Sequence, residues 1–421
     1  MITLAELKTK TVCFVGNGLF GAFARKVAPF FKKAYYAPAW RGQFPKSNQL
    51  RLWEGFPEFE QVKYPLLLAD EIDLWVFLDV YSADLQVMLR ERGARVFGAG
   101  LGEEIELDRW DFIGKLHELD LPVPGVELVT GVEALRKKLK GQKDKFIKLR
   151  FGYARGDKET WKYKNDQIGE GVLDEMQYDL GVFKKSTEFL IMDQVPKASE
   201  IGYDGPAVLG QWPEYAMQAY EVKGLGMAGH VKRYAELAAS IRLINGKFSP
   251  YLRKMDYAGL WSTEIQGRFF LDPCARAGSP SNELLQEMFT AESWARCMWD
   301  AAQGVMTSPV PVKGAEYGMC LMIYSEQSGK NCQPLFYPKA LDQWVKLRNG
   351  YREDGKSYSL PQGQPGNIAG VVGVGSSLEA AVAAVEENAK QVDGHLIEVG
   401  TDAIAKVREV IKNGEKEGIH F

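Results

Sequence analysis

The chain has 421 residues, of which 46% are hydrophobic and 25% are charged, and its formal net charge is −3 at pH 7. This length predicts roughly two to four domains, while the small net charge gives no support for a nucleic-acid or membrane-surface protein. We expect neither a membrane span nor a secretory signal, and the five scattered cysteines and four histidines indicate neither a disulfide framework nor a zinc site, which fits a cytoplasmic protein.

Strands and helices alternate in the N-terminal part of the chain. The first run is short, β-branched and apolar, as is typical of a buried parallel strand. We expect strands at residues 11–16, 33–39, 73–80 and 94–100. Helices are expected at 16–27, after the first strand, and at 82–93, before the last one. Strands separated by helices predict a doubly wound α/β domain with a parallel sheet.

Gly16, Gly18 and Gly21 spell G-x-G-x-x-G directly after the first strand. This pattern is typical of dinucleotide sites, but an NAD site also needs a carboxylate at the end of the second strand. Residues 37–40 there are Ala-Pro-Ala-Trp. Three interpretations stay open: an NAD site, a phosphate or small-anion site that uses Asn17 and Gly18 at a helix N-terminus, and turn geometry alone.

Further along the chain, a helix is expected with Trp110, Ile113 and Leu116 at helical spacing, and Pro122 and Pro124 stop it. A strand with the sequence KFIKLR follows it.

Lys148 interrupts the apolar run of this strand at 145–150. A lysine in a strand ordinarily extends its amine to solvent. Here a loop with two glycines and the cations Arg155 and Lys158 follows at 151–161. Such a loop can lie over phosphates, because glycine backbone approaches closely and the cations neutralise charge. A solvated hairpin is the alternative.

Carboxylate side chains occur at several positions in and after the next expected strand. The strand at 188–195 ends in Asp193 and Gln194, and in the segment that follows Glu200 and Asp204 alternate with apolar residues.

Two strands, 257–266 and 267–276, are expected to form a hairpin with a very short turn at Gln266 and Gly267. This hairpin would bring Glu264 and Asp272 close enough to share a cation, because two carboxylates that face one site are hard to keep charged without one.

In this order, the segments resemble the ATP-grasp ligases, and more narrowly the phosphoribosylamine–glycine ligase family. The resemblance runs over nearly the whole chain. It rests on GNGLFGAF, RGARVFGAG…ELDRWDF, KFIKLR, YAGLWSTEIQGRFFLDPCARAGSP and IAGVVGVGSSLEAAVAAVEENAKQV. In the last of these, Ser376 and Glu379 predict a capping box at the start of a helix, and Gly394 its stop.

The resemblance implies an N-terminal pre-ATP-grasp α/β domain at 1–103 and a two-lobed ATP-grasp core at 104–311, with a mobile lid lobe at about 125–195. A small C-terminal α/β domain would occupy 312–421. It also implies a reaction: ATP phosphorylates a carboxylate to an acyl phosphate, and an amine then displaces phosphate to leave an amide. ATP and Mg²⁺ (or Mn²⁺) would be required, and the substrates would be a small carboxylate, glycine or another amino acid, and an amine.

The resemblance also implies site residues, position by position. The ATP contacts would be Arg109, Lys148, Arg155, Lys158, Asp193, Gln194, Val195 and Glu200. Asp272 would be a metal ligand and part of the catalytic site, Glu264 would share the metal, and Arg276 would stabilise the acyl phosphate.

Two departures from the family pattern concern the metal and the substrate. Cys274 stands where the family has an asparagine metal ligand, and a thiolate does not suit magnesium. The segment that handles the family's amine is replaced by residues 220–237, in which Lys223, His230, Lys232 and Arg233 could bind an anionic substrate. Ser279 and Ser281 replace an acidic pair.

Three functions stay open on these grounds. The first is the purine-pathway ligase itself. The second is a relative that joins an acid to a different amine, for example on a modified nucleotide. The third is a nucleotide-binding protein with weakened catalysis, for which Cys274 is the motive.

Overall fold

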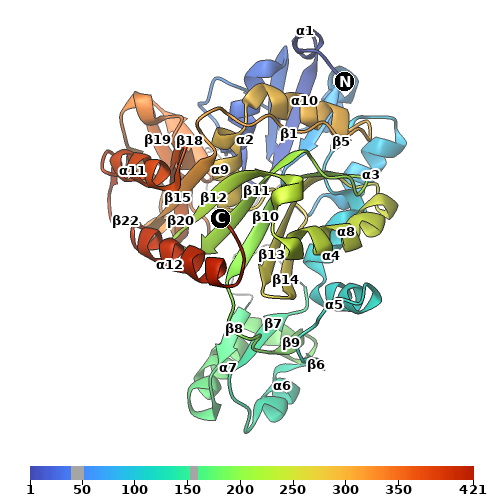
Figure 1. Cartoon of the computed structure of the whole chain (residues 1–421), viewed down its shortest axis with the longest axis vertical. Coiled ribbons are helices and arrows are strands. Elements are labelled where there is room, and N and C mark those ends of the chain that lie inside the picture. Colours follow the sequence, from blue (N-terminus) through green and yellow to red (C-terminus); the bar gives the residue numbers. More distant parts are fainter. Residues whose placement is uncertain (39–51, 152–159) are drawn as a thin grey trace. The chain divides into compact units, whose positions relative to one another are not determined.

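The computed structural model describes residues 1–38, 52–151 and 160–421 (Figure 1). Two compact units divide the chain. The first unit comprises Met1–Glu103, Ser199–Glu264 and Pro273–Phe421, and the second comprises Glu104–Ala198 and Ile265–Asp272. Within the described part of the chain, no helix has both the length and the apolar character that a membrane crossing requires.

The first unit begins with a parallel sheet in the order β3-β2-β1-β4-β5. The predicted doubly wound sheet is therefore confirmed. Thr11 of the central strand lies beside Lys33, and Val12 lies beside Leu74. The elements are α1 (Leu4–Leu7), β1 (Thr11–Gly16), α2 (Gly21–Val27), η1 (Ala28–Phe30), β2 (Lys33–Pro38), β3 (Glu60–Gln61), η2 (Pro65–Glu71), β4 (Leu74–Phe77), α3 (Ala83–Glu91), β5 (Val96–Phe97) and η3 (Gly100–Glu103).

Apolar residues of β1, β2 and β4 form the core of this sheet. Side chains such as Cys13, Tyr35 and Trp75 are almost completely buried there. The continuous apolar runs are required because helices and loops cover a parallel sheet on both faces. The carboxyl ends of β1 and β4 are thereby fixed beside each other, at the point where the strand order reverses.

A large antiparallel sheet follows in the order β14-β13-β10-β11-β12-β15-β20-β17, with β22 paired to β15. Gly202 lies opposite Ala219, and Asp204 opposite Met217. Its strands are β10 (Glu200–Val208), β11 (Tyr215–Val222), β12 (Gly226–Arg233), β13 (Ala258–Gln266), β14 (Phe269–Cys274), β15 (Tyr317–Ser325), β17 (Val345–Leu347), β20 (Gly366–Gly375) and β22 (Ile397–Val399). The predicted hairpin of β13 and β14 is confirmed, with Gly267 and Arg268 as its turn instead of Gln266 and Gly267.

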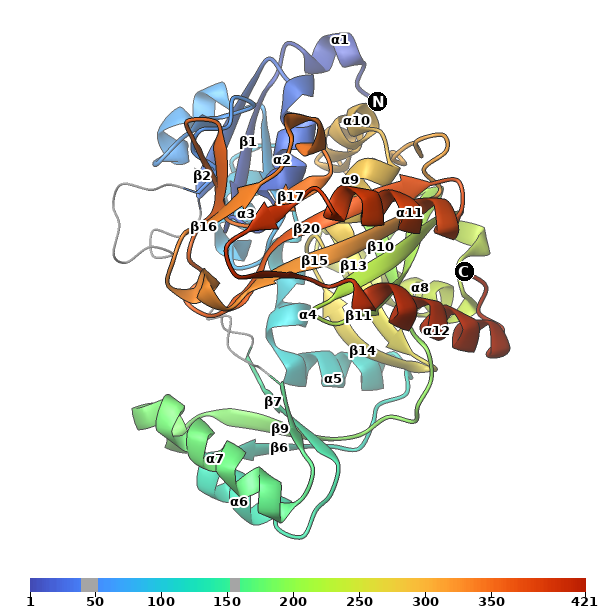
Figure 2. The same ribbon diagram turned by 90° about the vertical axis from the view of Figure 1, so that its left-hand side faces the viewer.

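Helices pack on this sheet. Figure 2 shows α11 beside β15 and β20, and α12 contacts β11 and β12. The remaining helical segments of the first unit are η5 (Tyr234–Glu236), α8 (Ala239–Lys254), α9 (Ser281–Met288), α10 (Ala291–Ala301), η6 (Glu326–Gly329), η7 (Lys339–Leu341), α11 (Leu378–Ala389) and α12 (Asp402–Lys416). A small antiparallel sheet, β18-β19-β16-β21, completes the unit with β16 (Gln333–Phe336), β18 (Gly350–Glu353), β19 (Lys356–Ser359) and β21 (Asp393–Gly394).

One helix boundary corrects the sequence prediction. Ser377, not Ser376, caps α11, because its hydroxyl accepts a hydrogen bond from the amide of Ala380 at 3.2 Å. The helix ends at Ala389, and Gly394 lies in β21 instead of stopping it.

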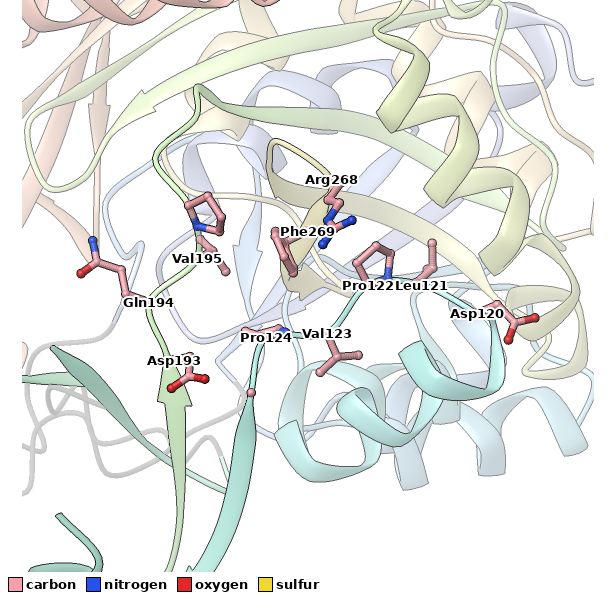
Figure 3. Close-up of a pocket in the computed structure, with 12 residues that line it drawn as sticks. Asp120, Leu121, Pro122, Val123, Pro124, Asp193, Gln194, Val195, Arg268 and Phe269 are labelled. Atoms are coloured by element: carbon pink, nitrogen blue, oxygen red, sulfur yellow. The ribbon is translucent and has the colours of Figure 1, made fainter. Parts of the chain in front are cut away.

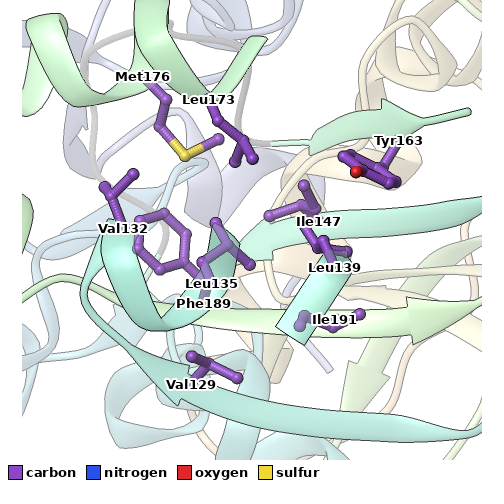
Figure 4. Packing of buried hydrophobic residues seen from close by; sticks show 10 residues of the cluster. All are labelled: Val129, Val132, Leu135, Leu139, Ile147, Tyr163, Leu173, Met176, Phe189 and Ile191. Carbon is purple, nitrogen blue, oxygen red and sulfur yellow. The ribbon is translucent and has the colours of Figure 1, made fainter. Parts of the chain in front are cut away.

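The second unit holds an antiparallel sheet in the order β6-β9-β7-β8, with α6 and α7 packed together on it. Figure 4 shows its core, in which Leu135 and Leu173 of the helices meet Ile147 and Phe189 of the strands. The elements are α4 (Glu104–Leu107), α5 (Arg109–Glu118), β6 (Val126–Thr130), α6 (Val132–Leu139), β7 (Lys145–Leu149), β8 (Thr160–Tyr163), α7 (Asp166–Leu180), η4 (Gly181–Lys185) and β9 (Glu188–Asp193).

Candidate active site

The lysine predicted to bind ATP and the carboxylate predicted to bind metal form an ion pair in the second unit. Lys148 lies near the end of β7 and Asp272 in β14, and Lys148 Nζ is 2.7 Å from Asp272 Oδ2. The lysine side chain is only 14% exposed and the aspartate 35%. Lys148 therefore does not extend to solvent but directs its charge at a carboxylate 124 residues further along the chain.

Beside this pair, Arg150 binds two carboxylates, one of which caps the start of a helix. Its guanidinium donates two hydrogen bonds to Asp108 Oδ2, one of them 2.7 Å from Nη2, and a third from Nη1 to Glu188 Oε2 at 3.0 Å. The hydrogen bonds to Asp108 raise the pKa of Arg150. Asp108 in turn caps α5 by accepting from the amides of Trp110 and Asp111. Arg150 was missed in the sequence, although it follows Lys148 by two residues, directly after the end of β7.

Arg109 is the first residue of α5. Its amide donates to the carbonyl of Arg150 at 2.9 Å, and its Nη1 to the carbonyl of Leu149 at 3.0 Å. The second unit thus gathers three cations, Arg109, Lys148 and Arg150, around the end of β7.

The strand end at Asp193 opens on a cavity. This cavity has a volume of about 560 Å³, and its wall comprises Asp120, Leu121, Pro122, Val123, Pro124, Gly125, Asp193, Gln194, Val195, Pro196, Arg268 and Phe269. Figure 3 shows Asp193, Gln194 and Val195 along one side of it and residues 120–122 along the other. All three predicted adenine-contacting residues therefore line one pocket, of a size that suits a small ligand.

Asp193 is held in place from two sides. Lys145 forms an ion pair with its carboxylate, and its backbone amide donates to the carbonyl of Gly125 at 2.8 Å. Gly125 leaves the room for this approach, since a side chain there would collide with the Asp193 carboxylate.

In the first unit, carboxylates gather on one face of β10, β11 and β13. Lys223 Nζ is 2.9 Å from Glu264 Oε2 and 3.8 Å from Glu200 Oε1. The register of β10 and β11, continued by two residues, places Glu221 opposite Glu200. Burial, and then the charge of Glu264, raise the pKa of Glu221. Lys223, which was predicted to bind an anionic substrate, pairs with these carboxylates.

The glycine turn after β1 is closely packed. Gly18 has a φ of +100°, its amide donates to the Tyr36 hydroxyl at 3.1 Å, and its carbonyl accepts from Trp53 Nε1 at 2.7 Å. A side chain at Gly21 would collide with the Trp53 ring. Turn geometry and close packing thus account for two of the three glycines of the motif.

Arg276 lies by this turn. Its Nε is 3.7 Å from Asp79 Oδ1, and Asn17 Nδ2 donates to the other oxygen of Asp79 at 2.8 Å. The amide of Ala277 donates to the carbonyl of Leu78 at 3.0 Å, which fixes the segment after β14 at the end of β4. Asn17, Asp79 and Arg276 therefore meet at the reversal point of the parallel sheet, where α/β folds bind ligands.

The remaining residues predicted to bind substrate are buried or contact other side chains. Ser279 Oγ contacts the guanidinium of Arg348, which also pairs with Glu283. Ser281 begins α9 and is 1% exposed. The His230 ring stacks on Tyr317 with centroids 4.0 Å apart, and burial lowers the pKa of His230 to about 4. His230 is therefore neutral at physiological pH.

Among residues 1–38, 52–151 and 160–421, no group of three or more His, Cys, Asp and Glu side chains is arranged to hold a metal ion. Asp272 and Glu264 fall in different units, so the predicted shared cation stays a prediction. The predicted phosphate-covering loop at 152–158, with Arg155 and Lys158, lies outside the described residues.

Solved structures match the fold over almost the whole chain, although no model of a protein family and no curated protein matches the sequence. Phosphoribosylamine–glycine ligase from Thermotoga maritima matches with a TM-score of 0.69 and 15% identity, over 92% of this chain and 98% of that one. The biotin carboxylase domain of the Hydrogenobacter thermophilus 2-oxoglutarate carboxylase, in complex with MgADP, ADP and bicarbonate, matches with a TM-score of 0.63 and 10% identity over 98% and 96%. N5-carboxyaminoimidazole synthetase from Staphylococcus aureus, complexed with ADP, matches with a TM-score of 0.57 and 13% identity over 90% and 97%. The chain therefore has the ATP-grasp fold that the sequence resemblance predicted.

Proposed function

We propose that the protein is an ATP-dependent carboxylate–amine ligase that forms an amide through an acyl phosphate. The observation that carries this proposal is the ion pair of Lys148 and Asp272. A partly exposed aspartate suits a divalent cation, and a lysine beside it suits a phosphate. Bound MgATP would satisfy both residues at once, with the metal on the carboxylate and the triphosphate on the ammonium.

The nucleotide would lie along β7 and the cavity next to β9. Asp193, Gln194 and Val195 line that cavity and are suited to read the edge of a base, while Arg109 and Arg150 add positive charge at the end of β7. Two of the matching solved structures contain ADP or MgADP. Arg155, Lys158 and Glu200 complete the proposed set of nucleotide contacts.

The carboxylate of Asp272 is a suitable ligand for Mg²⁺ or Mn²⁺, whereas the thiol of Cys274 is not. Mg²⁺ is commonly held by one or two carboxylates together with the phosphates of its nucleotide, so the Asp272 carboxylate would suffice. The Cys274 thiol is a poor ligand for either cation. When bound, the cation neutralises charge on the transferred phosphoryl group.

Arg276 would stabilise the acyl phosphate at the reversal point of the parallel sheet. Asp79 lies beside its guanidinium, and a guanidinium is suited to bind a phosphate or carboxylate. The acid would be glycine or another amino acid. The acceptor would be an amine other than phosphoribosylamine, because the residues of the acceptor segment differ from the family pattern and its Lys223 is paired with carboxylates.

The test is ADP release from ATP and Mg²⁺ with each of the twenty amino acids in turn, with and without hydroxylamine, which traps an acyl phosphate as a hydroxamate. Asp272→Asn should abolish both products, whereas the matched surface variant Asp179→Asn in α7 should leave them unchanged. ADP and hydroxamate with one acid would establish the reaction and identify that acid.

ATP binding without turnover of any acid would contradict the ligase and favour a nucleotide-binding protein. Cys274→Asn distinguishes the cause, because it restores an oxygen ligand at the family's asparagine position. A gain of activity in that variant would locate the defect at the metal.

A further inference from the structure

The cavity beside β9 has a third wall, which comes from the turn between β13 and β14. Arg268 and Phe269 line this wall. In the view of Figure 3 they lie between Val195 on one side of the cavity and Leu121 and Pro122 on the other. Every residue that lines the cavity belongs to the second unit, so one compact unit contains the whole space.

Hydrogen bonds between the segments hold the walls of this cavity in place. The amide of Asp193 donates to the carbonyl of Gly125 at 2.8 Å, which joins the segments on two sides of the cavity. Gln266 Nε2 donates to the carbonyl of Ala198 at 3.3 Å, which joins the hairpin of β13 and β14 to the segment after β9. The cavity is therefore formed before a ligand arrives, as is usual for small-molecule sites.

The guanidinium of Arg268 is the positive charge of this third wall. It lies over the ring of Phe269, 5.2 Å from the ring centroid, and Phe269 itself is 9% exposed. Within residues 1–38, 52–151 and 160–421, no carboxylate lies at ion-pair distance from Arg268. A guanidinium has five N–H donors, and a cation–π contact uses none of them.

The cations proposed to bind phosphate lie at the other end of β7. Lys145 is opposite Asp193 in the register of β7 and β9, next to the cavity. Lys148 follows three residues later, about 10 Å away at the usual rise of a strand. Arg109 donates to the carbonyl of Leu149 at that same end. A nucleotide with its phosphates at Lys148 therefore has its base, and not its phosphates, in the cavity.

We propose that Arg268 binds the base of the nucleotide, and that its guanidinium donates a hydrogen bond to a ring nitrogen of that base. This inference rests on the proposed function and adds a residue of the hairpin turn to the nucleotide contacts. Ring nitrogens of adenine accept hydrogen bonds, and a guanidinium can only donate them. The carboxylate of Asp193, which also lines the cavity, can only accept, so the two side chains are complementary to different atoms of one base.

Calorimetric titration of the full-length protein in the presence of Mg²⁺ tests the proposal with two ligands. One is AMP-PNP, an ATP analogue that is not hydrolysed, and the other is inorganic tripolyphosphate, which has three phosphates and no base. Arg268→Ala should weaken binding of AMP-PNP about tenfold and leave the affinity for tripolyphosphate unchanged, because only the contact with the base is lost.

Arg268→Lys keeps the charge but loses the planar fork, and should recover only part of the affinity for AMP-PNP. Arg408→Ala is the matched control, since Arg408 is an exposed arginine of α12 in the first unit. An equal loss for both ligands would mean that Arg268 acts on the phosphates through its charge. No loss for either ligand would mean that Arg268 does not contact the nucleotide. Either result would overturn the proposal.

The same titrations distinguish this proposal from that of the ligase. Calorimetry does not depend on turnover, so failure of the hydroxamate assay would contradict the ligase and leave the result for Arg268 standing. A wild-type protein that binds tripolyphosphate and AMP-PNP equally well would overturn the inference on Arg268 alone, because the base would then contribute nothing to binding.

Discussion

At the scale of single residues, Lys148 and Asp272 neutralise each other. The Asp272 carboxylate takes the place of the phosphate proposed to bind Lys148. The Lys148 ammonium takes the place of the metal ion proposed to bind Asp272. Their pair has to open when nucleotide and metal bind. Because one side chain is 35% exposed, the pair contributes about 1 kcal/mol or less to stability.

We therefore expect Lys148→Met to reduce ATP turnover about 100-fold or more while the melting temperature changes little. Lys148→Arg keeps the charge and should retain more of the ATP affinity, since a guanidinium also binds phosphate. Calorimetric ATP affinity and thermal unfolding of both variants provide the measurement. A large drop in melting temperature with Lys148→Met would show that the pair serves stability instead.

Asp204 is a buried carboxylate whose charged form the fold disfavours. Burial raises the pKa of Asp204 to about 6, although the hydroxyls of Ser281 and Ser262 act to lower it. The pKa of an aspartate in an unfolded chain is about 3.9. The native state therefore binds the proton more tightly than the unfolded state does, and the stability that this proton contributes is lost as the pH rises from about 4 through 6.

Asp204→Asn, which carries no charge at any pH, should therefore be more stable than wild type at pH 7.5, by about 1–3 kcal/mol. This advantage should shrink as the pH falls to 5. Thermal unfolding of both proteins between pH 5 and pH 8 measures the difference. An advantage that stays constant with pH would mean that the carboxylate has an ordinary pKa.

At the scale of the element, the start of α11 shows how closely local geometry selects a cap. Ser376 and Ser377 are adjacent, and either could open a helix that follows. The structure selects Ser377, whose extended backbone (φ −146°, ψ 163°) aims its hydroxyl at the Ala380 amide. An N-cap must have such a non-helical backbone, and its side chain must reach an amide of the first turn.

Ser377→Ala is accordingly expected to cost about 1 kcal/mol of stability, and the exposed Ser376→Ala to cost almost nothing. Chemical denaturation of the two variants side by side compares adjacent serines that differ only in this hydrogen bond. A larger loss of stability in Ser376→Ala than in Ser377→Ala would mean that Ser376 is the N-cap, as predicted from the sequence.

At the scale of the whole molecule, buried charges join segments of the first unit that are far apart in the chain. Glu287 of α9 accepts from Lys26 of α2 at 2.8 Å and from Lys346 of β17 at 2.6 Å. Burial acts to raise the pKa of Glu287, but the two lysines hold it below its usual value. Burial also lowers the pKa of Lys346, whose side chain is 5% exposed.

Glu287→Leu should destabilise the protein by about 3–5 kcal/mol, because it leaves the Lys346 ammonium buried without a carboxylate. Adding Lys346→Met should recover most of this loss, since two apolar groups then fill the same space. Denaturation of the single and double variants completes the cycle. Additive losses would indicate that the two side chains do not interact.

Much of the secondary structure and the class of the fold followed from the sequence alone. The run at 11–16 is a strand in the structure, and the runs at 145–150 and 188–195 contain the slightly shorter strands β7 and β9; the strand–helix alternation of the N-terminal part predicted its parallel sheet. These features can be recognised from short stretches of the sequence, because burial of one or both faces of an element sets the periodicity of its apolar side chains. The resemblance carried by short motifs then predicted the ATP-grasp fold.

Only the tertiary structure decided which side chains meet. It paired Lys148 with Asp272, assigned Lys223 to carboxylates, and placed Asp204, Ser262 and Ser281 around Gly278. None of these contacts has a signal in the sequence, because strand order and register bring together residues that are far apart in the chain and whose spacing carries no period. The sequence by itself determined the elements and the fold; the packing of those elements determined the chemistry at their ends.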